Sequence, residues 1–178
     1  MEHQKGDKHA ADFTIREAIA DDANDLAAVH VTTFNETHGI FPSGPSYKTR
    51  KWQWDEAFAT ADGTWFCFVV ISQEGELIGF AKGQPYSHDD QPDFSGELNK
   101  IYLLKRYHRL GLGKRLLAEI AKRFIIMNIN SMVLFGDAAN ASNHFYEAMG
   151  AEKLFAKNGE FHGGYGWRNL QELLIALQ

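Results

Sequence analysis

The 178-residue chain is predicted to fold as one mixed α/β domain, a single mostly antiparallel sheet of about seven strands flanked by helices. Three observations predict this class. Apolar strand-like runs are spread along the whole chain, two neighbouring runs are joined by a short glycine turn, and a strongly amphipathic helix lies between two strands. The length falls in the usual range of a single domain, and no Pro/Gly linker or internal repeat divides the chain.

The first third of the chain predicts one strand followed by two helices. A strand is expected at 13–18, and Asp21 and Asp22 after it are helix-start signals before apolar residues at helical spacing. Glycines and prolines predict a loop at 38–47, and a second helix is expected at 52–60.

The next part predicts antiparallel strands. The apolar run 65–71 and the segment 77–84 are joined by Glu74-Gly75, an arrangement typical of a hairpin. A polar loop is expected at 85–96, and a fourth strand at 97–104.

The clearest helix follows this fourth strand. Its apolar residues fall at i, i+4, i+5, i+8, i+12 and i+13, which is one face of a helix. They are Leu112, Leu116, Leu117, Ile120, Phe124 and Ile125. A fifth strand is expected at 132–135. Strand, helix and strand make a βαβ unit, so the fourth and fifth strands should be parallel.

The end of the chain predicts a short helix and two strands. The helix is expected at 141–149, where Gly150 is a helix-ending signal. Strands at 152–156 and 161–169 close the predicted domain.

The composition excludes several classes of protein. Cys67 is the single cysteine, so the chain has no intramolecular disulfide and no multi-cysteine zinc site. The histidines lack metal-ligand spacing, and we predict no metal. No apolar run reaches the roughly 18 residues of a membrane span. We expect a disordered leader at 1–12, a domain at 13–178 and a soluble, cytoplasmic protein.

The net charge of −5 is distributed unevenly. Residues 98–124 hold eight basic side chains against one glutamate, a net charge of +7, which leaves −12 for the rest of the chain. An acidic protein of this kind is not expected to bind nucleic acid through its overall charge. The local basic segment indicates a discrete anionic ligand, or else a solvated helix face.

A glycine-containing run begins the amphipathic helix. The first turn of a helix leaves N–H groups without internal partners, and these groups with the helix dipole form an anion site. Two familiar nucleotide-binding motifs do not match this run. A P-loop needs Gly at position 108 and Ser or Thr at 115, where this chain has His108 and Arg115; a dinucleotide fingerprint needs Gly where Leu116 stands.

The run resembles motif A of the GCN5-related N-acetyltransferase (GNAT) superfamily, Gln/Arg-x-x-Gly-x-Gly/Ala after the fourth strand. Its positions here are His108, Arg109, Leu110, Gly111, Leu112 and Gly113. A second block of that family is matched downstream, with Asn140, then Tyr146 and then Gly150 at the family's spacing. The resemblance extends from about residue 13 to 170 and implies the GNAT fold.

The resemblance implies acetyl-CoA as cosubstrate. The pyrophosphate would be bound by the loop from Arg109 to Lys114, and the pantetheine arm would pair with main-chain groups as an added strand does. The implied binding residues are Ile101, Tyr102, Leu103, Arg109, Leu110, Gly111, Leu112, Gly113, Lys114, Asn140 and Tyr146.

The resemblance also implies catalytic roles, with two departures. Tyr146 would be the general acid toward the CoA sulfur, and the N–H of Leu103 the donor to the oxyanion. His108 replaces the usual Gln or Arg, which should weaken phosphate binding modestly. Phe135 stands where several members have a glutamate base.

For the general base we therefore select Glu97, at the start of the fourth strand. Strict alternation puts Glu97 on the side of Ile101 and Leu103, although a bulge would change that. His38, His162 and a water chain remain alternatives.

The predicted function is an N-acetyltransferase that moves the acetyl group of acetyl-CoA to a primary amine of a small molecule or peptide in a ternary complex. The acidic remainder of the chain faintly favours a cationic acceptor. No nucleic-acid or membrane partner is expected, and a homodimer is left open. The alternatives are a non-catalytic acyl-CoA sensor, an O-acetyltransferase and a different acyl donor.

The remaining conspicuous residues are given simple interpretations. Cys67 should be inert core, which argues against a covalent acetyl-cysteine. Trp52, Trp54 and Trp65 should be core. The glycine-rich segment 161–167 and the loop with Phe41 and Tyr47 are candidate borders of the acceptor pocket.

Overall fold

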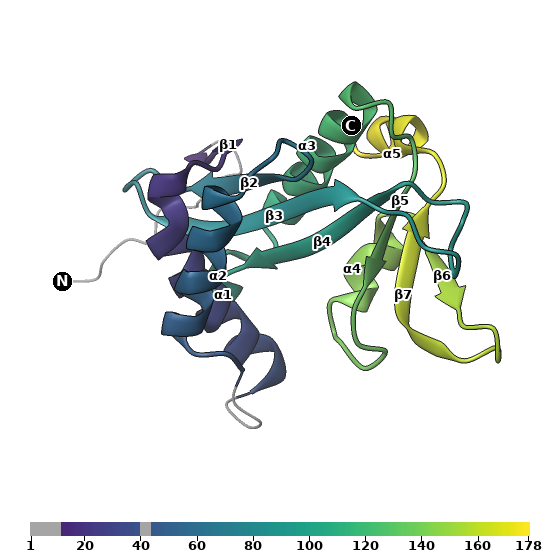
Figure 1. Cartoon of the computed structure of the whole chain (residues 1–178), viewed down its shortest axis with the longest axis horizontal. Helices are drawn as coiled ribbons and strands as arrows, with labels where there is room; N and C mark the ends of the chain where they lie inside the picture. The colour runs from purple at the N-terminus through teal and green to yellow at the C-terminus, as the bar shows by residue number, and fades with distance from the viewer. Residues whose placement is uncertain (1–11, 40–43) are drawn as a thin grey trace.

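The computed structural model describes residues 12–39 and 44–178, so the predicted leader and Phe41 lie outside the described residues, Asp12 excepted. Seven strands form one sheet in the order β1-β2-β3-β4-β5-β7-β6 (Figure 1). The strands are β1 Thr14–Glu17, β2 Phe66–Ile71, β3 Leu77–Pro85, β4 Gly96–Leu103, β5 Met132–Phe135, β6 Glu152–Phe155 and β7 Phe161–Trp167. The helices are α1 Ala23–His38, α2 Tyr47–Ala59, α3 Leu112–Ile126, α4 Asn143–Ala148 and α5 Leu170–Ala176, with short 3-10 turns at Ala20–Asp22 and Lys105–Tyr107. The predicted fold class is confirmed.

The sheet is antiparallel except at its centre. The neighbours β1–β2, β2–β3, β3–β4, β5–β7 and β6–β7 all pair antiparallel. β4 and β5 pair parallel, as the βαβ unit requires, through only two positions, Gly96 with Met132 and Glu97 with Val133. Beyond Glu97 the two strands diverge, and Figure 1 shows the gap that opens between them.

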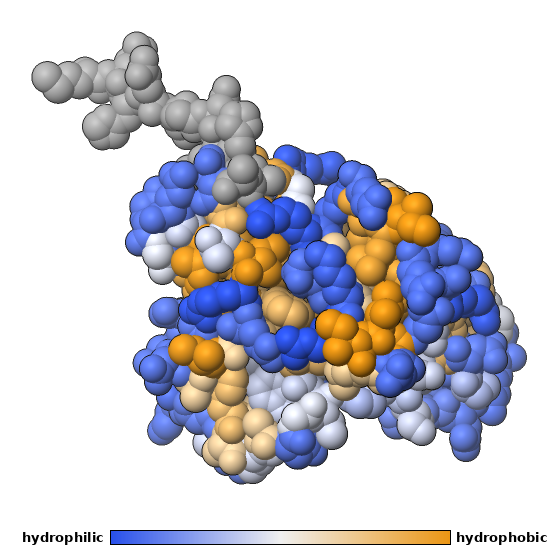
Figure 2. Space-filling model, turned by 90° about the horizontal axis from the view of Figure 1, so that it is seen from above, coloured by the Kyte–Doolittle hydropathy of each residue, from blue (hydrophilic) through white to orange (hydrophobic). Residues whose placement is uncertain are grey.

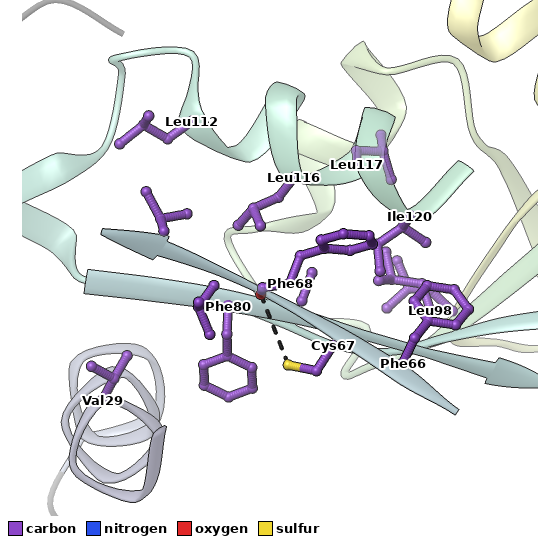
Figure 3. Packing of buried hydrophobic residues seen from close by; sticks show 14 of the residues in the cluster. Val29, Phe66, Cys67, Phe68, Phe80, Leu98, Leu112, Leu116, Leu117 and Ile120 are labelled. Carbon is purple, nitrogen blue, oxygen red and sulfur yellow. Dashed lines mark hydrogen bonds between the residues drawn. The ribbon is translucent and has the colours of Figure 1, made fainter. Parts of the chain in front are cut away.

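Helices cover both faces of the sheet. α1 and α2 lie together on one face, and α3 lies on the other. Figure 3 shows Leu112, Leu116, Leu117 and Ile120 of α3 on one side of the strands and Val29 of α1 on the opposite side. These four α3 side chains are at most 1% exposed. Burial of a leucine or isoleucine contributes about 1.5–3 kcal/mol, so the apolar face of α3 anchors the segment that precedes it.

A bulge in β4 changes which face of the sheet Glu97 occupies. Lys82 of β3 is opposite Lys100, but the next residue, Gly83, is opposite Leu98, so Asn99 is the extra residue. Glu97 is opposite Gln84 and lies on the α1/α2 face. The prediction from strict alternation, that Glu97 lies on the same face as Ile101 and Leu103, is therefore wrong.

The C-terminal helix α5 was not predicted. Asn169 caps it, because its Oδ1 accepts hydrogen bonds from the N–H groups of Gln171 and Glu172. Leu170 and Leu173 are buried, and α5 packs against α3. The domain thus closes with a helix and not with strand β7.

The tryptophans do not all belong to the core. Trp54 is 4% exposed and Trp65 is half-buried, but Trp52 is 62% exposed, which corrects the prediction for that residue. On the face seen in Figure 2, hydrophobic side chains occur in several groups among hydrophilic ones. Within the described residues, no helix has the length and apolar character needed to cross a membrane.

Candidate functional site

The gap between β4 and β5 leaves one edge of β4 without a strand neighbour. The N–H of Leu104 donates to the carbonyl of Ile78 on β3 at 3.0 Å. Because main-chain groups alternate in an antiparallel pair, Tyr102 is also turned toward β3, whereas Ile101 and Leu103 direct their N–H and C=O groups to the gap. Of the three predicted main-chain residues, Ile101 and Leu103 are thus at the edge where an extended ligand could add as a strand.

The loop before α3 ends beside this edge. Its backbone takes left-handed conformations at Arg109 (φ 66°) and Gly111 (φ 77°), and a residue without Cβ adopts the second at no steric cost. The first intrahelical bond runs from the N–H of Arg115 to the carbonyl of Gly111, at 3.1 Å. The preceding N–H groups of Leu112, Gly113 and Lys114 therefore have no partner within the helix and can bind an anion.

Two contacts join this loop to its surroundings. The His108 ring lies with Nε2 2.8 Å from the carbonyl oxygen of Leu103, so His108 joins the loop to the edge of β4. A Cβ on Gly113 would stand 3.3 Å from the Phe145 ring, so α4 packs closely over the first turn of α3. Leu112 is buried in the core, and its side chain serves packing.

The basic segment 98–124 divides into groups with different partners. Arg106, Lys122 and Arg123 form ion pairs with Glu76, Glu119 and Glu17. Arg109 and Lys114 form no ion pair with any carboxylate among the described residues, and they flank the free N–H groups. The charge available to an anion at the loop is therefore much smaller than the segment's +7.

Tyr146 lies on α4 and is 7% exposed. Its ring packs against Tyr165 and Trp167, with centroid distances of 5.7 and 6.4 Å. Burial raises the pKa of the Tyr146 phenol, and the nearby Tyr102 and Tyr165 add to the effect, so the hydroxyl stays protonated. Among the described residues this hydroxyl has no hydrogen-bond partner, which leaves it free to donate to a ligand.

Asn140 shapes the turn before α4. Its Oδ1 accepts from the N–H of Ser142 at 2.9 Å, an Asx turn, so the side-chain amide remains for another partner. Sequence reasoning missed Asn143, which is 7% exposed. The Asn143 amide donates to the carbonyls of Asp137 and Ala138, at 3.0 and 3.1 Å, and fixes the same loop.

The glycine-rich segment of β7 supports α4. A Cβ on Gly163 would stand 2.6 Å from the carbonyl carbon of Asp137, so only glycine allows the β5–α4 loop to pass there. The Tyr165 hydroxyl donates to Glu147 at 2.7 Å, and the Trp167 indole donates to the carbonyl of Met149 at 2.9 Å. These contacts give this segment a structural role behind Tyr146.

Glu97 contributes to a pocket of about 250 Å³ on the α1/α2 face, near the end of β5. The Glu97 carboxylate accepts from Gln84 at 2.7 Å and from Asn99 at 3.3 Å. The other lining residues are Tyr86, His88, Asp90 and Phe135.

Sequence reasoning missed three residues of this pocket because the segment 85–96 has the composition of a polar loop. The Tyr86 ring stacks on His88 and on Phe135, with centroid distances of 5.0 and 5.6 Å, and its hydroxyl donates to Asp90 at 2.8 Å. The dense aromatic and titratable residues Tyr86, His88 and Asp90 were the available signal.

The alternative bases lie outside this pocket. His38 stacks on Phe34 at the end of α1, with a centroid distance of 4.6 Å. His162 is 66% exposed and lies 3.4 Å from Glu160. Tyr47, which was predicted to border the acceptor pocket, does not line this pocket either; it is exposed, and its hydroxyl donates to Asn24 at 3.3 Å.

Cys67 is buried in β2 with 1% exposure, and burial raises the pKa of its thiol, so it has the character of inert core. Its thiol lies 3.8 Å from the carbonyl oxygen of Phe68, a weak hydrogen bond drawn in Figure 3. In the part of the chain that the structure describes, no three His, Cys, Asp or Glu side chains are grouped to hold a metal ion.

Comparison with known proteins gives a consistent result. The model of the acetyltransferase (GNAT) family matches residues 26–151. A Bacillus subtilis strain 168 protein described as an uncharacterized N-acetyltransferase, YuaI, is 32% identical over 175 residues, which cover 92% of this chain and 98% of that protein.

Solved structures share the fold at lower identity. The PaiA N-acetyltransferase of Thermoplasma acidophilum, in complex with coenzyme A, is 19% identical with a TM-score of 0.65, over 86% of this chain and 97% of that one. A phosphinothricin acetyltransferase of Sinorhizobium meliloti, in complex with acetyl-CoA, is 21% identical with a TM-score of 0.62, over 87% and 86%.

Proposed function

Because the chain belongs to the GNAT acetyltransferase family, we propose that it transfers the acetyl group of acetyl-CoA to a primary amine of a small molecule or peptide, directly within a ternary complex. One observation carries the proposal: the open edge of β4 and the N–H groups at the start of α3 lie at the same gap between β4 and β5, and the buried Tyr146 phenol is close enough to Tyr102 of β4 to be affected by it.

The cosubstrate would bind by main-chain groups. The pantetheine amides would hydrogen-bond Ile101 at the open edge, and the side-chain amide of Asn140 would reach the same arm. The carbonyl of Leu103 is already in contact with His108, so its N–H is the group that Leu103 offers to the gap. The pyrophosphate would accept hydrogen bonds from the loop N–H groups of residues 110–114, with Arg109 and Lys114 adding charge. Two structures of the same fold were solved with acetyl-CoA, which supports acetyl-CoA as the cosubstrate.

The reaction needs a neutral amine, a donor to the oxyanion and stabilisation of the leaving thiolate. The amine nitrogen attacks the thioester carbonyl, a C–N bond forms, the C–S bond breaks, and one amine proton is released. The N–H of Leu103 faces the gap and would donate to the oxyanion, a contribution of about 3 kcal/mol for a preorganised donor.

Tyr146 would act at the sulfur. The raised pKa keeps its hydroxyl protonated, so the phenol is always available as a donor. A thiol has a pKa of about 8.5, below that of this phenol, so complete proton transfer to a thiolate is uphill. Tyr146 therefore stabilises the thiolate chiefly as a hydrogen-bond donor.

Glu97 would accept the amine proton. Its carboxylate is held by Gln84 and Asn99 and lines the pocket on the α1/α2 face, where an acceptor can approach β4. His88 lines the same pocket and is the alternative base that the geometry adds to those considered from sequence.

The test combines a binding measurement with a thiol-release assay. Calorimetry measures acetyl-CoA binding, and free CoA release is followed over a panel of primary amines. Binding with amine-dependent release is the expected result. Binding without turnover on any amine would identify an acyl-CoA sensor, and absence of binding would overturn both functions.

A further inference from the structure

Three basic side chains converge on the α1/α2 face of the sheet, beside the proposed acceptor pocket. Lys82 of β3 and Lys100 of β4 are direct register partners, so their side chains leave the same face side by side. Arg50 of α2 faces them closely enough for its charge to act on Lys100. Like charges placed opposite one another on a sheet repel, so this arrangement has a cost.

None of these three cations forms an ion pair with a carboxylate among the described residues. The Lys100 ammonium donates to Asn99 Oδ1 at 2.7 Å, and the Lys82 ammonium lies 4.9 Å from the centroid of the Trp65 ring. Arg50 donates to Gln53 at 3.1 Å, and its buried Nε has no hydrogen-bond partner in the part of the chain that the structure describes.

Several arginines outside the cluster are paired with carboxylates. Arg16, Arg123 and Arg168 bind Asp22, Glu17 and Asp93. The three-cation cluster differs from these arginines, because it has a buried donor and no carboxylate partner among the described residues.

The electrostatics of the cluster favour an added anion. Burial lowers the pKa of Lys100 to about 8, and repulsion from Lys82 and Arg50 contributes. Burial likewise lowers the pKa of Lys82 and of Arg50. Glu97 acts on both lysines, but its oxygens are bound by Gln84 and Asn99. An anion among the three cations would offset both the burial and the repulsion.

The face has opposite charges at its two ends. Glu97 and Asp90 line the pocket at one end, and Lys82, Lys100 and Arg50 form the other. This arrangement is complementary to a zwitterion, whose ammonium group would lie toward Glu97 and whose carboxylate would lie among the cations. A guanidinium with a free N–H matches a carboxylate well, because its planar donors fit the two oxygens.

We propose that the acceptor is a small amine that also carries a carboxylate, and that Lys82, Lys100 and Arg50 bind this carboxylate. The inference rests on the proposed acetyltransferase function and names the class of its acceptor. It departs from the cationic acceptor favoured by the acidic remainder of the chain, because local charge at the site decides binding and net charge only steers encounter.

The first test compares matched acceptors on the unaltered protein. Amino acids and ω-amino acids such as β-alanine and 4-aminobutyrate are each assayed against their own carboxamides, with spermidine as a polycation. We expect kcat/KM to be about tenfold or more higher for each preferred carboxylate than for its amide, as for loss of one charge-assisted hydrogen bond. Faster turnover of the amides or of spermidine would overturn the inference and leave the acetyltransferase function intact.

The second test alters the cluster. Lys82→Met and Lys100→Met should raise KM for the carboxylate about tenfold, with little change for the amide and with unchanged acetyl-CoA affinity. Lys157→Met, which removes an exposed lysine from the β6–β7 turn, is the matched control and should leave the preference unchanged.

A charge reversal keeps the inference testable if the methionine variants are unstable. Lys100→Glu should shift the preference from the carboxylate toward a diamine, a gain that unfolding cannot produce. An unchanged carboxylate preference in the folded Lys100→Glu variant would contradict the assignment of the cluster. If acetyl-CoA binds but no amine of any class is acetylated, the proposed function fails and the inference fails with it.

Discussion

His30 is a buried titratable residue that the fold keeps neutral. It is 2% exposed, and its ring packs against Trp54, Phe80 and Tyr102. Its Nδ1 has no hydrogen-bond partner within residues 12–39 and 44–178. Burial lowers its pKa from 6.5 to about 3, and the charges of Arg50 and Lys100 act in the same direction. The folded state therefore binds fewer protons than the unfolded state between these two pH values.

This difference predicts an acid-sensitive stability. The contribution of neutral His30 is complete above pH 6.5 and is lost as the pH falls, by about 1.4 kcal/mol per pH unit. Replacing His30 with Phe should flatten the dependence of the unfolding free energy on pH between 6 and 4, measured by urea denaturation. His162→Gln, at an exposed position, is the control; equal slopes for wild type and His30→Phe would contradict the prediction.

Tyr146→Phe tests the hydroxyl without changing the packing of its ring. We expect kcat to fall about 100-fold or more, with acetyl-CoA affinity nearly unchanged, because the hydroxyl donates only as the thiolate leaves. Steady-state kinetics and calorimetry measure the two quantities. Tyr165→Phe, which keeps a ring but loses the bond to Glu147, is the matched control, and a comparable loss of kcat there would remove the special role of Tyr146.

Glu97→Gln tests the proposal that Glu97 is the general base. The loss of the proton acceptor should lower kcat/KM about 100-fold and abolish the limb of the pH–rate profile that reports the base. Asp90→Asn, in the same pocket, serves as the control for a general change of charge. An unchanged rate and pH profile in Glu97→Gln would contradict the assignment of Glu97 and leave His88 as the candidate base.

At the scale of the elements, the start of α3 depends on one left-handed residue. Gly111 has φ 77°, and a Cβ there would meet no atom within 4 Å, so the cost of a side chain is one of backbone conformation alone. Gly111→Ala should cost about 1–2 kcal/mol of stability and weaken CoA binding, because the alanine backbone moves the loop N–H groups. Gly111→Asn should lose less stability and less CoA affinity than Gly111→Ala, since asparagine tolerates this conformation. Thermal unfolding measures the stability of the two variants, and calorimetry measures their CoA affinity. Equal losses in the two variants would contradict this account.

Strand β4 shows what local patterns predict and what they miss. Its existence, direction and place beside β5 were predicted, because apolar runs and a crossover helix are properties of neighbouring residues. The bulge at Asn99 was not, because an extra residue leaves no signature in a stretch where polar and apolar residues mix. That one residue decides that Glu97 faces α1 and α2 and that Lys100 lies opposite Lys82.

At the scale of the whole molecule, α5 returns the end of the chain to α3. Leu173 is 4% exposed and Ile175 is 70% exposed on the same helix. Leu173→Ala should destabilise the protein by about 2–3 kcal/mol, and Ile175→Ala should change stability by no more than about 0.5 kcal/mol. Urea denaturation tests both; similar effects of the two substitutions would show that α5 does not support the core.

The sequence by itself determined the fold class, most of the elements, the position of the candidate anion-binding loop and the family, since these depend on periodicity and on motifs within short stretches. Tertiary structure decided which charges remain available. The charge of Arg123, in the basic segment, is neutralised by an ion pair with Glu17, which lies more than 100 residues away in sequence. Lys82, Lys100 and Arg50, in contrast, come together from three different elements. The physical reason is that strand register decides on which face of the sheet a side chain lies. Residues distant along the chain decide which partners it contacts, and neither is fixed by composition or spacing.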